Sequence, residues 1–148
     1  KGENVFKGYF RNKLETKKAF FNDYFLTGDI GYRDNNGRFF FADRIKDLII
    51  KGGVNILPSE IENIIYKFKD VKEVAVTSCF DEFYGENICC FVVPKKNSKI
   101  DLNKIDTWCE KSLGTFKKPE KYVVLDSLPK GISGKILKLE LKKKTNEK

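Results

Sequence analysis

The sequence predicts an α+β fold, in which a small domain with a short mixed or antiparallel β-sheet is flanked by helices and preceded by a hairpin strip. Two observations predict it. Short β-branched runs follow one another across turn-rich segments, and they alternate with stretches whose apolar residues recur at the helical period. Of the 148 residues, 41% are hydrophobic and 34% are charged, which is the balance of a globular protein.

Residues 1–57 predict one hairpin and, after it, a second hairpin or tight turn. Residues 1–22 show no clear period and predict a loop with a weak helix around "LETKKAFF". The stretch "DIGYRDNNGRFFFADR" predicts a hairpin, because Asn36-Gly37 is a strong two-residue turn signal. The stretch "KDLIIKGGVNIL" predicts a second tight turn at Gly52-Gly53, where glycine permits backbone angles that a side chain would forbid.

Two amphipathic helices are expected farther along. "SEIENIIYKF" predicts a helix with a capping box of Ser59 and Glu62, and it places four apolar residues on one face: Ile61, Ile64, Ile65 and Phe68. "DLNKIDTWCEKSL" predicts a helix with Asp101 as its cap. Its inward residues are expected to be Ile105, Trp108, Cys109 and either Ser112 or Leu113.

The remaining strands follow from β-branched runs. "EVAVTSCF" and "ICCFVVP" are separated by the turn-rich "DEFYGEN", so they are expected to pair as antiparallel strands. "KYVVL" predicts a third strand, and "ILKLELKKK" predicts a short helix near the C-terminus.

The ionisable residues exclude some kinds of site. The four cysteines have no C-x-x-C spacing and there is no histidine, so a zinc site is not expected and core thiols in a reducing compartment are the simplest account. The net charge of +8 is compatible with nucleic acid, an anionic membrane surface or phosphate-bearing ligands. Its densest cluster, from Lys138 to Lys144, predicts a solvated tail, and no apolar run has the length of a membrane span.

One lysine, Lys135, stands behind a glycine in the loop "LPKGISGK". It does not complete a phosphate-binding loop, because Pro129 occupies the position of the first glycine and Ile136 follows the lysine in place of Ser or Thr. The lysine therefore needs another explanation.

Three stretches taken in order resemble the AMP-forming acyl-CoA synthetase superfamily, which also includes luciferases and nonribosomal-peptide adenylation domains. They are "YFLTGDIGY", "FADRIKDLIIKGGVNILPSEIE" and "LPKGISGK". The resemblance implies that residues 1–44 are the end of a large AMP-binding domain and that residues 45–148 are the mobile C-terminal domain. The phosphate loop and the acyl pocket would then lie outside this chain, and the chain alone is expected to be inactive.

The resemblance also assigns roles in two half-reactions, carboxylate adenylation by ATP and transfer of the acyl group from AMP to CoA. Lys135 matches the lysine that stabilises negative charge during adenylation. Asp29 matches the aspartate that binds both ribose hydroxyls, and Arg44 matches an arginine that reaches the ribose or phosphate. Without the resemblance, Lys135 would be a solvated loop lysine, Asp29 a turn residue and Arg44 a salt-bridge partner.

Lys46 falls on the hinge position of the family, and Gly52 and Gly53 are expected to line the tunnel for the pantetheine arm of CoA. An ordinary surface charge and a plain hairpin turn are the alternatives. The implied ligands are ATP or AMP and CoA, with Mg²⁺ accompanying ATP and bound by residues outside this chain. The implied partners are the large N-terminal domain and a carboxylic acid substrate, in the cytoplasm.

Two other functions stay open. The acceptor could be a phosphopantetheinyl carrier protein, since the motifs are shared with enzymes that load one. A basic RNA-binding sheet is a different class, but the sequence lacks the aromatic strand pattern of such modules and only "RFFFADR" approaches it.

Overall fold

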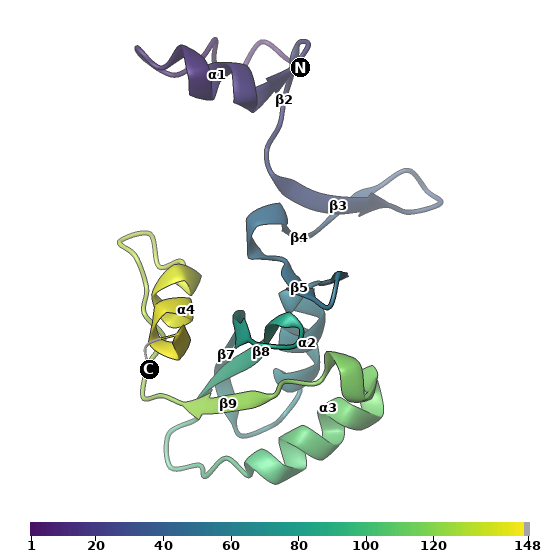
Figure 1. Ribbon diagram of the computed structural model, residues 1–148, viewed down its shortest axis with the longest axis vertical. Coiled ribbons are helices and arrows are strands. Elements are labelled where there is room, and N and C mark those ends of the chain that lie inside the picture. The colour runs from purple at the N-terminus through teal and green to yellow at the C-terminus, as the bar shows by residue number, and fades with distance from the viewer. Residues whose placement is uncertain (147–148) are drawn as a thin grey trace. The chain divides into compact units, whose positions relative to one another are not determined.

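The computed structural model describes residues 1–146, which form two units. Unit 1 is Lys1–Lys46, and unit 2 starts at Asp47. Each unit is described by itself, with the elements labelled as in Figure 1.

Unit 1 consists of one short helix and two small antiparallel hairpins, which confirms the predicted hairpin around Asn36-Gly37. Asn12 caps the helix, because its Oδ1 accepts a hydrogen bond from the backbone N–H of Glu15 at 3.1 Å. The turn between the second pair of strands is held by Asp34, whose Oδ1 accepts from the N–H groups of Asn36 and Arg38. The elements are α1 (Lys13–Ala19), β1 (Phe20–Phe21), β2 (Tyr24–Phe25), β3 (Asp29–Arg33) and β4 (Phe39–Arg44).

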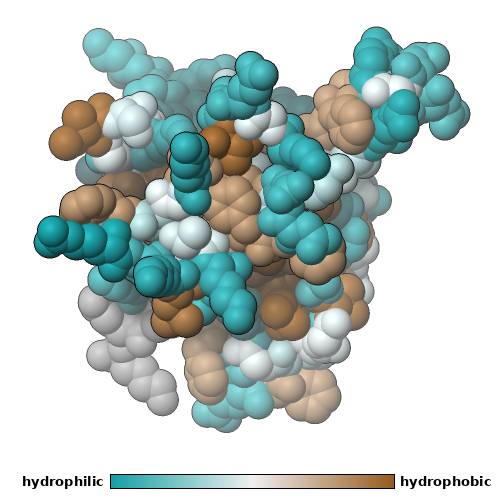
Figure 2. All heavy atoms as spheres, turned by 90° about the horizontal axis from the view of Figure 1, so that it is seen from above, coloured by the Kyte–Doolittle hydropathy of each residue, from teal (hydrophilic) through white to brown (hydrophobic). Residues whose placement is uncertain are grey.

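Unit 1 has no buried apolar core of its own. Asp43 is the one residue of this unit that is buried, while Phe10, Phe39 and Phe41 are 87%, 82% and 67% exposed. Figure 2 shows apolar side chains, brown and tan, lying open on the surface among hydrophilic ones. Exposed aromatic side chains in this number are typical of a surface that packs against another body.

Unit 2 contains a mixed five-stranded sheet, and its central strand is buried from Asn87 to Val93. β7 and β8 pair antiparallel, as predicted, and β5 and β6 form the predicted second hairpin. β9 pairs with β8 in parallel, because the connecting helix α3 (Leu102–Lys117) returns the chain to the end of the sheet at which β8 begins. The strands are β5 (Ile49–Lys51), β6 (Val54–Ile56), β7 (Val71–Asp81), β8 (Gly85–Pro94) and β9 (Lys121–Val124).

Helices cover both faces of this sheet and so create two cores. The helices α2 (Pro58–Ile65) and α3 (Leu102–Lys117) pack against one face, while α4 (Lys138–Asn146) packs against the other (Figure 1). Adjacent residues of β8 belong to different cores: Cys90 lies with α2 and α3, and Cys89 lies with α4. The two cysteines therefore point to opposite faces, as their place on a strand predicts.

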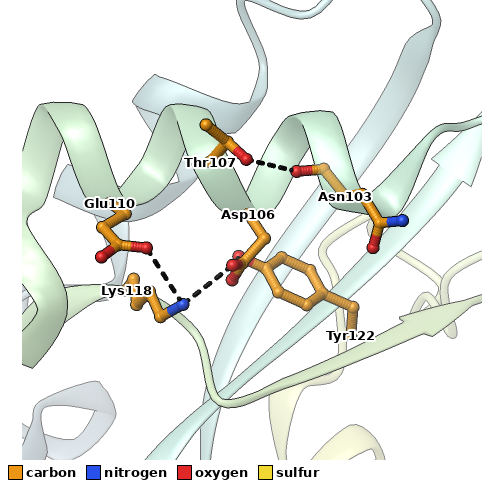
Figure 3. Close-up of polar contacts among 6 residues, drawn as sticks. All are labelled: Asn103, Asp106, Thr107, Glu110, Lys118 and Tyr122. Carbon is orange, nitrogen blue, oxygen red and sulfur yellow. Dashed lines mark hydrogen bonds and ion pairs between the residues drawn. The ribbon is translucent and has the colours of Figure 1, made fainter.

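A side-chain network joins α3 to β9, as Figure 3 shows. The ammonium of Lys118 lies 2.8 Å from a carboxylate oxygen of Asp106 and 3.4 Å from one of Glu110. The hydroxyl of Tyr122 donates to the other oxygen of Asp106 at 3.2 Å. The hydrogen bond to Asp106 raises the pKa of Lys118 above its usual value. The network thus fixes the end of α3 on the parallel strand that follows it.

The predicted capping box of α2 is wrong. The helix begins at Pro58 after an N-cap at Leu57, and no side chain bonds to the cap. Glu62 is instead used by the rest of unit 2, since its Oε1 accepts from the backbone N–H of Val76 at 2.8 Å and pairs with Lys138. Proline at the first helical position already supplies the missing start signal, because its fixed φ suits a helix and it has no N–H to satisfy.

The predicted inner face of α3 is partly wrong. Asp101 caps the helix through the N–H of Lys104, and Ile105 and Cys109 are buried, as expected. Trp108, however, is 43% exposed. Of the two alternatives at the next turn, Leu113 packs against the core and Ser112 is exposed. None of the helices in residues 1–146 combines the length and apolarity of a segment that crosses a bilayer.

Candidate functional site

The loop that carries Lys135 is a tight, hydrogen-bonded hairpin. Lys130 and Ile136 form an isolated antiparallel bridge, and the N–H of Gly131 donates to the carbonyl of Lys135 at 2.9 Å. Gly134 has a φ of +76°, a left-handed conformation that only glycine adopts readily. The backbone thus places Lys135 at a defined point beside the loop tip, where Ile132 is fully exposed.

The lysines on both sides of this hairpin are neutralised. Lys130 pairs with Glu73 at 2.6 Å, and Lys138 pairs with Glu62 at 2.7 Å. Lys135 lies between them, is exposed, and makes no ion pair within residues 1–146. The two ion pairs therefore fix the base of the hairpin to β7 and α2, and the ammonium of Lys135 stays available at its end.

The predicted solvated lysine tail is only partly correct. Lys138 and Lys142 lie on α4 and pair with Glu62 and Glu86, at 2.7 and 2.8 Å. Lys143 and Lys144 are exposed. The cluster splits because one side of α4 packs on the sheet, so that the lysines on that side reach carboxylates of α2 and β8.

Asp29 and Arg44 lie together in unit 1. They are directly opposite each other in the β3–β4 register, and Arg44 Nε lies 3.0 Å from Asp29 Oδ1. Thr27 supports this turn, since its hydroxyl oxygen accepts from the N–H of Asp29 at 3.1 Å, and the carbonyl of Gly28 accepts from Ile45. The two side chains keep 33% and 48% of their surface exposed. A carboxylate and a guanidinium are therefore presented side by side, open to a polar ligand.

Lys46 lies in the short 3₁₀ helix η1 (Ile45–Asp47), and the boundary between the two units falls directly after it. Short 3₁₀ turns are frequent connectors, and the hinge at Lys46 stays a prediction.

Gly52 and Gly53 form the turn between β5 and β6, with φ values of +54° and +80°. The N–H of Gly52 donates to the carbonyl of Tyr84 at 3.0 Å. A side chain at Gly52 would begin 3.0 Å from the Tyr84 ring, whereas nothing lies within 4 Å of the corresponding position at Gly53. The turn thus needs glycine for its backbone angles, and at Gly53 it presents bare backbone to open space.

Sequence reasoning missed two polar residues that hold this turn in place. Lys51 is 4% exposed, and its ammonium donates to the carbonyl of Phe116 at 3.0 Å and lies 5.1 Å from the ring centroids of Tyr84 and Phe116. No local pattern distinguishes Lys51 from a surface lysine, because its partners lie 33 and 65 residues away in the chain.

The second missed residue is Glu86, which accepts hydrogen bonds from the N–H of Ile50, the hydroxyl of Ser78 and the ammonium of Lys142. Burial opposes ionisation of this carboxyl, but those three hydrogen bonds outweigh it and lower the pKa of Glu86. Glu86 thereby joins the β5–β6 hairpin, here called the glycine hairpin because its turn is Gly52-Gly53, to α4. No group of His, Cys, Asp and Glu side chains in the described part could hold a metal ion.

Comparison with known proteins identifies what this arrangement is similar to. A family model described as the AMP-binding enzyme C-terminal domain matches residues 60–135. The long-chain-fatty-acid–CoA ligase of Bacillus subtilis is 39% identical over 147 residues, which is 99% of this chain and 26% of that protein. The 2-succinylbenzoate–CoA ligase of a Geobacillus species is also 39% identical, over 96% of this chain and 29% of that protein.

Solved structures agree. The ATP-bound structure of MatB from Rhodopseudomonas palustris has a TM-score of 0.92 and 38% identity, covering 97% of this chain and 29% of that one. The apo structure of the same protein has a TM-score of 0.70 over the same share of each chain. The two MatB structures therefore differ from each other within the stretch that this chain spans.

Proposed function

Because the chain belongs to the AMP-binding enzyme C-terminal domain family, we propose that it is the C-terminal part of an AMP-forming acyl-CoA synthetase. It spans between a quarter and a third of the length of the curated relatives it matches. The activity proposed for the whole protein has two halves: a carboxylate reacts with ATP to give an acyl-AMP and pyrophosphate, and the acyl group then passes to the thiol of CoA.

The observation that carries this proposal is the placement of Lys135. In adenylation, negative charge builds up where the carboxylate oxygen attacks the α-phosphate, so a fixed cation there favours the transition state. Lys135 is exposed beside the tip of an ordered hairpin, while Lys130 and Lys138 are held by glutamates. A lysine suits this duty because its compact charge lies on a long stem that can reach into a site.

Asp29 and Arg44 are proposed to bind the nucleotide. Their side chains fit it, because the carboxylate of Asp29 can accept from two vicinal hydroxyls while Arg44 keeps its guanidinium beside it. Unit 1 would then be the end of the large AMP-binding domain, and its exposed aromatic side chains support this, since they need a covering surface. Mg²⁺ bound with ATP would be held by residues outside this chain.

The glycine hairpin is proposed to serve the second half-reaction. Bare backbone at Gly53 leaves room for the pantetheine arm of CoA, and a rotation at Lys46 would present this turn in place of Lys135. The ATP-bound and apo MatB structures differ within the stretch that this chain spans, which supports movement within this part of such enzymes.

CoA is the proposed acceptor because the relatives described above are CoA ligases, and a carrier protein is the alternative. Those two relatives are equally similar to this chain although their names give different acids, so this chain is not expected to select the acid. Four free cysteines support the predicted cytoplasmic location.

The test uses the intact polypeptide with Lys135→Ala, and with Lys143→Ala as a matched control on an exposed lysine of α4. Pyrophosphate exchange measures adenylation, and thioester formation from supplied acyl-AMP measures the second half. We expect Lys135→Ala to slow exchange by roughly 100-fold or more while the thioester step stays almost unchanged. Lys143→Ala is expected to alter neither. An equal loss in both halves for Lys135→Ala would refute the assigned role.

A further inference from the structure

A shallow groove with an aromatic floor lies on unit 2, between the α2–β7 connection and the first turns of α3. Its volume is about 510 Å³, and Phe68, Ile100 and Trp108 contribute apolar side chains to it. A second hollow of about 460 Å³ shares Phe68 and Trp108 and continues along α3 to Lys111. The two hollows share four lining residues and so form one continuous surface, which none of the residues assigned above to nucleotide or CoA lines.

The aromatic floor is unusually open. Trp108 is 43% exposed and meets Phe68 edge to face, with ring centroids 6.2 Å apart. Inward-facing residues of α3, such as Ile105 and Cys109, are buried completely. Trp108 is therefore much less buried than the neighbouring residues on the same face of α3. A partly exposed tryptophan beside a hollow is typical of an interface anchor.

The rim of the groove is basic. Five lysines surround the two hollows, against two carboxylates, Asp70 and Asp101. Of these five lysines, only Lys104 forms an ion pair within residues 1–146, with Asp101 at 3.3 Å. The other four rim lysines are exposed and make none in that range: Lys67, Lys69, Lys99 and Lys111.

Elsewhere in unit 2 the lysines are of two kinds. Five find a carboxylate within 3.0 Å, namely Lys117, Lys118, Lys130, Lys138 and Lys142. Others, such as Lys135, Lys143 and Lys144, are exposed and make no ion pair within residues 1–146. What distinguishes the groove is that its four unpaired lysines surround an apolar floor. A surface that combines unpaired charge of one sign with an apolar floor is complementary to an amphipathic segment of the opposite sign.

We propose that this groove docks an acidic segment of a partner protein, with carboxylates along the lysine rim and one apolar side chain against Phe68 and Trp108. The rim holds no arginine, the side chain best suited to forked recognition of phosphate, whereas lysines act as point charges that suit carboxylates spaced along a peptide. This inference does not depend on the proposed enzyme activity.

Trp108 makes the inference directly testable, because it is the single tryptophan of the chain. The probe is a synthetic peptide of about twelve residues, with glutamates on both sides of a central Phe-Leu pair, titrated into the 148-residue chain. We expect a blue shift of the tryptophan emission on binding, and an affinity that falls about tenfold or more between low and high salt. Two comparison peptides replace the glutamates by glutamine or the Phe-Leu pair by serine, and both are expected to bind far more weakly.

Matched variants separate the groove from the general charge of the chain. Lys67→Glu with Lys99→Glu reverses two rim charges, and Lys143→Glu with Lys144→Glu makes the same change in net charge on α4. We expect the rim pair to weaken peptide binding by about tenfold or more and the α4 pair to change it by less than about twofold. Melting curves check that both variants fold.

Four outcomes would overturn the proposal. Equal binding of the glutamine peptide would show that charge plays no part, and equal weakening by both double variants would show attraction to net charge alone. An emission shift on concentrating the chain without peptide, together with dimer formation in sedimentation, would make a second copy the occupant. Displacement of the peptide by inorganic phosphate or ATP at the same concentration would make the groove a phosphate site.

Discussion

Lys138 on α4 and Glu62 on α2 form an ion pair at 2.7 Å, and the same oxygen of Glu62 accepts the backbone N–H of Val76 at 2.8 Å. One carboxylate oxygen thus joins α4, α2 and β7. Both side chains are less than a quarter exposed, at 23% and 22%. Lys135, only three residues before Lys138, is exposed and makes no ion pair within residues 1–146, so the two neighbouring lysines lie in different environments.

Lys138→Ala is expected to lower the free energy of unfolding by about 1–3 kcal/mol, because it leaves a mostly buried carboxylate without its cation. Lys135→Ala, the matched control, is expected to change it by less than about 0.5 kcal/mol, as an exposed side chain without an ion pair. Urea unfolding of the 148-residue chain measures both. Equal destabilisation by the two variants would contradict the division of roles.

The hinge predicts a selective effect of Lys46→Pro in the intact polypeptide. Proline fixes φ near the value of a 3₁₀ helix and removes a backbone donor, so it should trap one orientation of the two units. We expect the adenylating orientation to be kept, so that pyrophosphate exchange continues while thioester formation drops steeply.

Lys46→Ala is the control for this prediction, since it removes the charge but leaves the backbone free. It is expected to support both half-reactions. If a well-folded Lys46→Pro protein also kept both, as judged by its melting curve, the hinge would not lie at this residue.

Glu86 predicts an acid-sensitive contribution to stability. Its pKa is lowered in the folded chain, so its contribution is present above the unfolded value of about 4.5 and is lost as the pH falls through the folded pKa. Glu86→Gln should lower the free energy of unfolding by about 1–3 kcal/mol at pH 7, and this difference should shrink below pH 4.5. Urea midpoints from pH 7 to pH 3 measure it, with exposed Glu82→Gln as the control. A difference that stays constant with pH would contradict it.

The cysteines are expected to be nearly inert in the folded chain. Burial raises the pKa of Cys89 to about 12 and that of Cys90 well above its usual range, so their thiolates are scarce at pH 8. A colourimetric thiol reagent should react with half-buried Cys79 first, and with the three buried thiols only after denaturant is added. Rapid reaction of all four in the native chain would refute the buried positions.

Local patterns in the sequence predicted the elements, and long-range contacts decided the rest. The two glycine-centred hairpins and the inner face of α2 were predicted correctly, because turn chemistry and apolar period act over a few residues. The capping box was wrong because Glu62 is taken by partners 14 and 76 residues farther along the chain. Trp108 was expected to be buried because the apolar periodicity places it on the inner face of α3. Periodicity does not show how far along that face the rest of unit 2 covers the helix.

The same distinction applies to the candidate site. The predicted hairpin put Asp29 and Arg44 on neighbouring strands, but their direct pairing also depends on a register shift between Ile30 and Gly31 that the sequence did not predict. The buried position of Lys51 and the three bonds of Glu86 could not be predicted, because each depends on how separate elements pack. The catalytic role of Lys135, the hinge at Lys46 and the tunnel face of Gly52 and Gly53 stay predictions.

β8, with apolar side chains on both faces, lacks the alternation of polar and apolar residues that normally selects how a strand is aligned with its neighbour. A slip by one residue would exchange Cys89, Phe91 and Val93 with Ile88, Cys90 and Val92, at little hydrophobic cost. The alignment is chosen instead at the turn, where Asn87 donates to Asp81 at 2.9 Å and Ser78 donates to Glu86 at 2.9 Å. A few polar atoms beside the turn therefore decide which side chains enter which core along the whole strand.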